Sequence, residues 1–187
     1  MSDWPTQQEA QAILDEWCKN KNLKKHAYAV EAAMKAYAER LAADPEKWGI
    51  VGLLHDFDYE KYPDLADHPF KGVEFLAAKG YGKELTDAII AHAKHTGTVR
   101  DSDLKKVIYA VDELTGLIVA VALTRPSKKL ADVSVDSVMK KWKEKSFAAG
   151  VDRQMVERGA AELGVPLKEH IGVVLAAMQG IAEKLGL

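Results

Sequence analysis

Residues 104–123 constrain the fold most, because they are apolar on nearly every face of any helix that they could build. A helix that is apolar all round has to be covered on every side, so this segment predicts the central helix of its domain. Asp112 lies in the middle of the segment. An unpaired buried carboxylate is costly, so Asp112 needs a cationic partner, which a metal ion, a histidine or an arginine could supply.

The remaining apolar residues recur at three- and four-residue spacing, which indicates further helices, and no strand alternation interrupts them. Thr6 and Glu9 have the spacing of a capping box, and Asp44 followed by Pro45 separates two helices. We therefore expect an all-α chain of about eight or nine helices, folded as a single domain over residues 1–187. The expected helices are 7–20, 23–41, 45–54, 73–80, 85–92, 104–123, 135–142, one opened by Asp152, and 167–185.

Composition excludes several classes of protein. The 26 basic and 28 acidic residues give a net charge of −2, so no overall positive field would hold a nucleic-acid polymer. No segment approaches the roughly 20 apolar residues of a membrane-spanning helix, so we expect no membrane span. Cys18 is the only cysteine, and residues 1–5 lack the basic and apolar regions of a signal peptide. These features favour a cytoplasmic protein, and they do not predict its oligomeric state.

Several histidines and aspartates fall on or beside the expected helices. His26 shares a helix face with Val30 and Met34, and His55 and Asp56 end an apolar helix. A His-Asp dipeptide alone is weak, since about one chain in every two or three of this composition contains one by chance. The ordered set is more specific. It consists of His26, His55, Asp56, His68, His92 and Asp112.

This set resembles the pattern of the HD-domain superfamily, a group of all-α metal-dependent phosphohydrolases with an ordered His, His-Asp and Asp. The resemblance covers about residues 24–123 and implies an HD-type helical bundle, on which helices from residues 124–187 would pack. His68 and His92 lie in stretches similar to the His-Pro-x-x-Gly and Ala-Ile-x-x-His motifs of a subgroup with two extra histidines.

The chain departs from the family pattern at one place. Phe57 and Asp58 follow the His-Asp pair, where many members have isoleucine and glycine. The candidate ligands themselves are all present. The departure affects which residues form the floor of the pocket and to which subfamily the chain would be assigned.

The resemblance implies two metal ions. Mixed imidazole and carboxylate ligands suit Fe, Mn, Co, Ni or Zn better than Ca or Mg. Two such ions about 3.5–4 Å apart could bind the oxygens of a phosphate ester and present an activated hydroxide. The implied ligands of the first ion are His26, His55, Asp56 and Asp112, and those of the second are Asp56 as a bridge, His68 and His92. The alternative for His55 and Asp112 is a buried ion pair.

Cationic residues outside this set are candidates for contact with a phosphate. Lys94 and His95 follow the helix over residues 85–92, where a cation also complements the helix dipole for structural reasons. A second group follows the central helix and is, in the alternative, a solvated basic surface. It consists of Arg125, Lys128 and Lys129.

The expected function is that of a metal-dependent hydrolase of a small phosphate ester or nucleotide, with a small phosphorylated molecule as its only expected partner. One alternative is a mixed-valent diiron oxygenase, because a few relatives with the same six ligands use iron and dioxygen. The other is a helical module whose metal site is structural.

Overall fold

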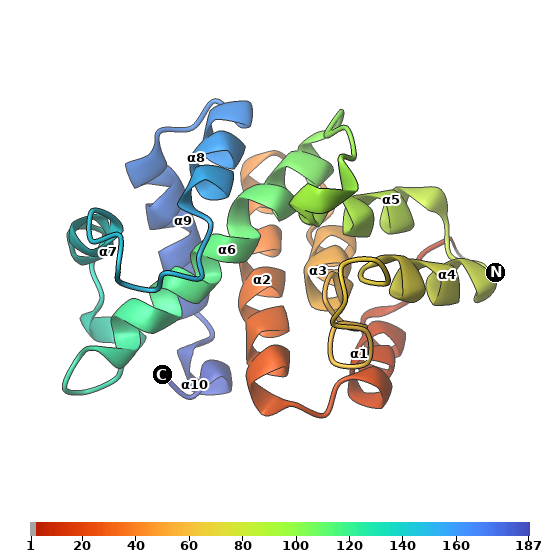
Figure 1. The fold of residues 1–187 in the computed structure, drawn as a ribbon, viewed down its shortest axis with the longest axis horizontal. Coiled ribbons are helices and arrows are strands. Elements are labelled where there is room, and N and C mark those ends of the chain that lie inside the picture. The colour runs from red at the N-terminus through yellow and green to blue at the C-terminus, as the bar shows by residue number, and fades with distance from the viewer. Residues whose placement is uncertain (1–2) are drawn as a thin grey trace.

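The computed structural model describes residues 3–187, which are helical with connecting turns and contain no strand (Figure 1). Nine of the ten α-helices in this range have eight or more residues, so the expected all-α fold is confirmed. The α-helices are α1 (Gln7–Trp17), α2 (Lys21–Arg40), α3 (Pro45–Leu54), α4 (Phe70–Ala78), α5 (Lys83–His92), α6 (Asp103–Leu123), α7 (Val135–Trp142), α8 (Arg153–Glu162), α9 (Leu167–Gln179) and α10 (Ala182–Leu185). The short 3-10 helices are η1 (Lys94–Thr96) and η2 (Leu130–Asp132).

Several expected helix ends differ from those in the structure; the helix expected over residues 73–80, for example, is α4 and begins at Phe70. The first helix ends at Trp17 rather than near residue 20, because the Asn20 side chain caps the start of α2 instead. The expected helix over residues 167–185 is divided into α9 and α10 around Gly180. Glycine loses more backbone freedom in a helix than other residues do, which favours a break at that position.

The expected central helix is α6. In Figure 1 it crosses α2, with α7, α8 and α9 on one side and α3, α4 and α5 on the other. Most of its apolar residues are buried, and Val107, Leu114 and Ile118 have no exposed surface, whereas Leu123 at its C-terminal end is exposed. No helix within residues 3–187 is both long and apolar enough to cross a membrane. The expectation of a single domain, in which the helices of residues 124–187 pack on the part that carries the motif, stays a prediction.

Two glycines allow neighbouring helices to approach closely, one between α2 and α3 and one between α6 and α8. A Cβ atom on Gly52 of α3 would lie 2.8 Å from the Cα of Glu31 in α2, and one on Gly159 of α8 would lie 2.6 Å from the Cα of Ala110 in α6. Real Cβ atoms essentially never come so close to a backbone atom. These glycines therefore let α3 pack closely on α2, and α8 pack closely on α6, with backbone against backbone.

Candidate metal centre

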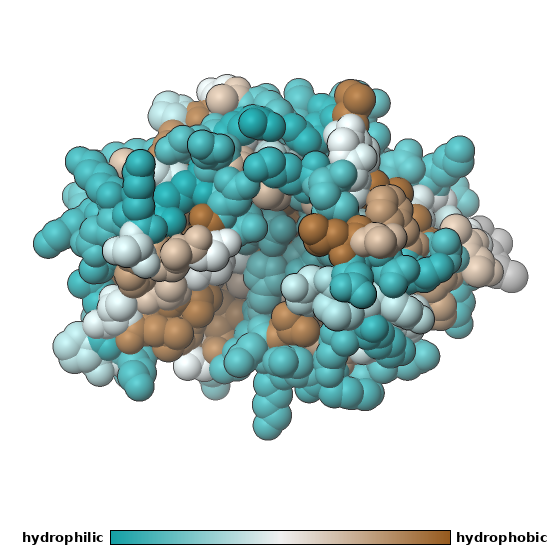
Figure 2. All heavy atoms as spheres, in the orientation of Figure 1, coloured by the Kyte–Doolittle hydropathy of each residue, from teal (hydrophilic) through white to brown (hydrophobic). Residues whose placement is uncertain are grey.

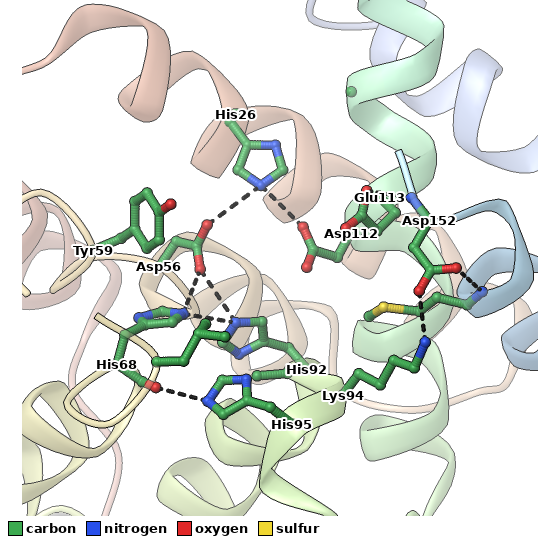
Figure 3. Close-up of a pocket in the computed structure, with 14 residues that line it drawn as sticks. His26, Asp56, Tyr59, His68, His92, Lys94, His95, Asp112, Glu113 and Asp152 are labelled. Carbon is green, nitrogen blue, oxygen red and sulfur yellow. Dashed lines mark hydrogen bonds and ion pairs between the residues drawn. The ribbon is translucent and has the colours of Figure 1, made fainter. Parts of the chain in front are cut away.

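The six predicted ligands come from three helices and two turn segments, and the structure brings them together. His26 lies on α2, His92 is the last residue of α5, and Asp112 lies near the middle of α6. His55 and Asp56 follow α3 directly, and His68 ends the turn segment before α4. Figure 3 shows His26, Asp56, His68, His92 and Asp112 pointing toward a common centre.

The first ligand group contains His26, His55 and Asp112. The Nε2 atoms of the two histidines are 3.1 Å apart. The Oδ1 atom of Asp112 lies 3.0 Å from Nε2 of His26 and 3.4 Å from Nε2 of His55. His55 is fully buried, whereas His26 and Asp112 keep a partly exposed edge.

The second ligand group contains Asp56, His68 and His92. The Nε2 atoms of the two histidines are 3.2 Å apart, and Oδ1 of Asp56 lies 3.3 Å and 3.2 Å from them. The other oxygen of Asp56, Oδ2, lies 3.7 Å from Nε2 of His26 and 3.5 Å from Nε2 of His55. The Asp56 carboxylate therefore faces one group with each oxygen, which is the position of a bridging ligand.

The outer nitrogen of each histidine is fixed by an acceptor. The Nδ1 atoms of His55 and His92 lie 2.7 Å and 2.5 Å from the carbonyl oxygens of Gly52 and Ile89. A carbonyl only accepts, so both nitrogens carry their proton and donate it. Both Nε2 atoms therefore present a lone pair to the centre when the ring is neutral.

The same holds for the remaining two histidines. Nδ1 of His68 lies 2.8 Å from Oδ1 of Asp58 and donates to it. The hydroxyl of Thr115 donates to the Asp112 carbonyl at 2.8 Å, so its oxygen is left to accept from Nδ1 of His26 at 3.2 Å. Such outer contacts are the usual means of orienting a histidine ligand toward a metal.

When the rings are neutral and the carboxylates are ionised, all of the ligand atoms that face the centre are hydrogen-bond acceptors. Within residues 3–187, Asp56 and Asp112 form ion pairs only with these histidines, and no lysine or arginine reaches them. Acceptors alone repel one another at these distances, so the centre needs cations, either protons on the rings or metal ions.

The spacing of the ligand atoms fits metal ions. With metal–nitrogen bonds of about 2.0–2.1 Å, two ligand atoms are separated by about 3.0 Å at a right angle and about 3.4 Å at a tetrahedral angle. The separations are 3.0, 3.1 and 3.4 Å in the first group and 3.2, 3.2 and 3.3 Å in the second. The residues present therefore fit one divalent transition metal ion in each group.

Without a metal ion, the carboxylates of the centre favour protons on His55 and His68. Burial lowers the pKa of His55, but Asp56 and Asp112 outweigh it and raise that pKa well above the usual value. Burial likewise opposes protonation of His68, while Asp56 and Asp58 raise its pKa to about 9. Burial tends to raise the pKa of Asp112, yet His55 and His26 hold it below its ordinary value. Protons and metal ions thus compete for the same nitrogens.

The stability of the metal-free protein is expected to fall as pH rises from 6.5 to about 9. The folded state binds the His68 proton more tightly than the unfolded chain does, so this stabilisation is complete below pH 6.5 and is lost by about pH 9. Denaturant titrations of chelator-treated protein across this range measure the decline. The decline should be smaller in His68→Ala. Equal declines in the two proteins would show that His68 is not protonated in the folded state.

The second group predicts a second ion. His92→Ala removes one of its two imidazoles, so the metal-to-chain ratio should fall from about two to about one while the other group stays loaded. Elemental analysis of the purified variant measures this ratio. His95→Ala is the matched control, because His95 lies at the same cavity but belongs to neither group. A ratio of two in His92→Ala would remove His92 from the ligand set.

Asp58 has a positioning role that the sequence analysis missed. It is fully buried, and while Oδ1 accepts from His68, Oδ2 accepts from the backbone N–H of Gly72 at 2.8 Å. Phe57 beside it packs its ring against Trp17 and Phe75. The departure from the family pattern therefore places one residue in the core and the other behind a ligand. The only signal in the sequence is an aspartate two residues after the His-Asp pair.

Asp58→Asn is expected to weaken metal binding in the second group by about 10- to 100-fold, the usual cost of losing an outer hydrogen-bond partner of a ligand. An asparagine side chain cannot accept from both His68 and Gly72, because its nitrogen only donates. Competition with a fluorescent chelator measures the affinity. Asp64→Asn, an exposed substitution in the same turn segment, should leave it unchanged. An unchanged affinity in Asp58→Asn would mean that Asp58 does not orient His68.

All of the ligands except the buried His55 line a cavity of about 710 Å³, which Lys94, His95, Glu113 and Asp152 also line. Lys94 forms an ion pair with Asp152 at 2.8 Å, and the backbone N–H of Asp152 donates to Glu113. Burial, together with the charges of Asp112 and Asp152, raises the pKa of Glu113. Nε2 of His95 donates to the His68 carbonyl at 2.9 Å (Figure 3), and Nδ1 has no hydrogen-bond partner among the described residues.

The second group of candidate phosphate contacts lies elsewhere. Asp112 and the end of α6 are eleven residues apart, about 16 Å along the helix. Arg125 follows that end and lines a separate cavity together with Lys140 and Lys141 of α7. Lys128 and Lys129 are not among the described residues that line the central cavity. None of these three residues lines the central cavity, and their contact with a phosphate stays a prediction.

Fold and site together define an all-helical protein with a His/Asp centre suited to two metal ions. A family model of the HD domain matches residues 23–117, slightly more than half of the chain. The chain therefore belongs to the HD domain family, and the resemblance in the sequence is confirmed. No match was found among curated proteins or among solved structures.

Proposed function

We propose that the chain is a metal-dependent phosphohydrolase that acts on a small phosphate ester or nucleotide. The observation that carries this proposal is the position of Asp56, whose two oxygens face two separate ligand groups at one end of an open cavity. The cavity of about 710 Å³ is large enough for a small molecule of this kind.

In this proposal, the six ligands would hold two metal ions and neighbouring residues would contact the phosphate. The first group, with one oxygen of Asp56, would hold one ion, and His68, His92 and the other Asp56 oxygen would hold a second. When bound, such ions polarise a phosphate ester and make a water molecule acidic enough to attack near neutral pH. Lys94 and His95 lie where they could contact the phosphate or the leaving group. Phosphoryl transfer depends mainly on such positioning and electrostatic stabilisation.

An iron-dependent oxygenase is the second candidate, and a specific observation favours it. Each ligand group consists of two histidines and one carboxylate, the set that non-haem iron oxygenases use. The hydrolase is preferred because Lys94 and His95 add cationic or proton-donating groups at the cavity, which a phosphate would require.

Phosphate release from a panel of monoesters, diesters and nucleotides, with and without oxygen, tests the proposal. We expect turnover by the protein as purified with its metal, unchanged under anaerobic conditions. Turnover that stops without oxygen would identify an oxygenase. Two bound ions per chain with no turnover on any ester would indicate a module that binds metal without catalysis.

A further inference from the structure

A second cavity, of about 350 Å³, lies between α2, α6 and the C-terminal end of the chain. Two residues line both this cavity and the one that contains the candidate metal centre, namely His26 and Gly116. Gly116 lies one helical turn after Asp112 on α6, and a Cβ atom built on it would meet nothing within 4 Å. The two cavities therefore adjoin at His26 and Gly116, where the space beside Gly116 is open.

The two cavities differ in chemistry. Four carboxylates line the central cavity, whereas none of the described residues lining the second is acidic. The walls of the second cavity are mainly aliphatic and include Val119, Leu123 and Leu187. Leu123 is 51% exposed, so its side chain is accessible to a molecule that enters the cavity. Lys25, at the rim, forms no ion pair within residues 3–187.

The surface shows the same arrangement. Figure 2 shows a hollow in the middle of the molecule, with hydrophobic atoms along part of its side. The α6 wall of the second cavity includes Val119 and Leu123. From Gly116 to Leu123 this wall extends over seven residues, about 10 Å along the helix. An alkyl group attached to a phosphate at the metal centre could therefore extend from Gly116 to Leu123 in contact with this wall.

We propose that this second cavity binds the apolar part of the substrate's leaving group, an alkyl or acyl chain whose phosphate lies at the metal centre. This inference rests on the proposed phosphohydrolase function. A chain fits better than a nucleobase, because no aromatic ring lines the cavity among the described residues except that of His26, which faces the metal centre. The absence of carboxylates and the aliphatic walls suit an uncharged chain, whose burial needs no polar partners.

Binding of methylphosphonate and octylphosphonate, which cannot be hydrolysed, tests the proposal by calorimetry on the protein with its metal. Each buried methylene should raise the affinity about three- to fourfold, so about four buried methylenes give a preference for the octyl compound of roughly 100-fold. Equal affinities for the two compounds would overturn the proposal, whether or not the protein hydrolyses esters.

Two variants test where the alkyl chain of the ligand binds. Gly116→Leu fills the junction and should reduce the preference for the octyl compound to less than about tenfold. Leucine is a better helix former than glycine, so the variant should fold, and its metal ratio checks the centre. Leu123→Asp places a charge on the far wall and should also reduce the preference. Val99→Asp, at a 73% exposed position outside both cavities, is the matched control and should keep it.

The outcomes separate this inference from the proposed function. If both variants retain the preference for the longer alkyl group, the proposal is overturned. The alkyl group would then bind elsewhere, for example along Tyr59 and Leu65 of the central cavity. A preference that both variants remove would support the apolar subsite even if no phosphate ester were hydrolysed. In that case only the proposed reaction would fail.

Discussion

Asp56→Ala is expected to abolish tight binding of both metal ions and, with it, any metal-dependent turnover. Asp56 is the only residue among those described whose two oxygens face both ligand groups. Its removal leaves two histidines for the second ion and takes one negative charge from the whole centre. Elemental analysis should find less than about 0.1 ion per chain, because the second group keeps no carboxylate, and the first keeps only Asp112 and loses an oxygen ligand and half of the negative charge at the centre.

The control for this variant is Asp136→Ala, which removes an aspartate that is 82% exposed and lies on α7, away from the centre. It should keep the metal ratio of the unmodified protein. Circular dichroism checks that Asp56→Ala remains helical, since four histidines without their central carboxylate could unsettle this end of the bundle. Full stoichiometric metal in a folded Asp56→Ala variant would remove Asp56 from the site.

Metal removal should also lower the midpoint of thermal unfolding. A ligand that binds only the folded state stabilises it by about 2.7 kcal/mol when present at 100 times its dissociation constant. In Asp56→Ala, a chelator should therefore cause no further decrease, which separates loss of the metal from loss of packing.

The sequence predicted the parts of this molecule that depend on local pattern or on burial. Asp112 demanded a partner because the segment around it is apolar, and the structure provides His26 and His55 at 3.0 and 3.4 Å. The alternative of a simple ion pair between His55 and Asp112 accounts for less. It leaves unexplained why Nε2 of His26 lies 3.1 Å from Nε2 of His55, with both rings held by outer acceptors.

The parts that could not be predicted depend on residues far apart in the chain. Thr115 orients His26 from a position 89 residues away, and only the packing of α6 on α2 brings the two together. Asp58 orients His68 through a turn segment without helical periodicity, so no pattern marks it. The ion pair between Lys94 and Asp152 joins residues 58 apart. Such contacts follow from tertiary packing, which local propensity does not specify.

The position of Lys94 and His95 was predicted in part. They were expected at the end of the helix that carries His92, and the structure places them in η1, immediately after α5 and at the edge of the central cavity. Their partners change the interpretation of each. Lys94 is about half exposed and already paired with a carboxylate, so a phosphate would have to share it with Asp152. His95 forms its one hydrogen bond within residues 3–187 through Nε2, so its Nδ1 atom is free to contact a substrate.

Replacing Lys94 and His95 together by alanine is expected to lower kcat/KM for the best phosphate ester by about 10- to 1,000-fold, the range typical of deleting an electrostatic stabiliser. The metal-to-chain ratio should stay unchanged, because neither residue belongs to a ligand group. Lys128→Ala with Lys129→Ala is the matched double variant, since it removes two cationic side chains outside the cavity. If that variant loses turnover while the Lys94 and His95 variant keeps it, the phosphate contacts lie beyond the end of α6, and η1 serves only to hold the His68 carbonyl through His95.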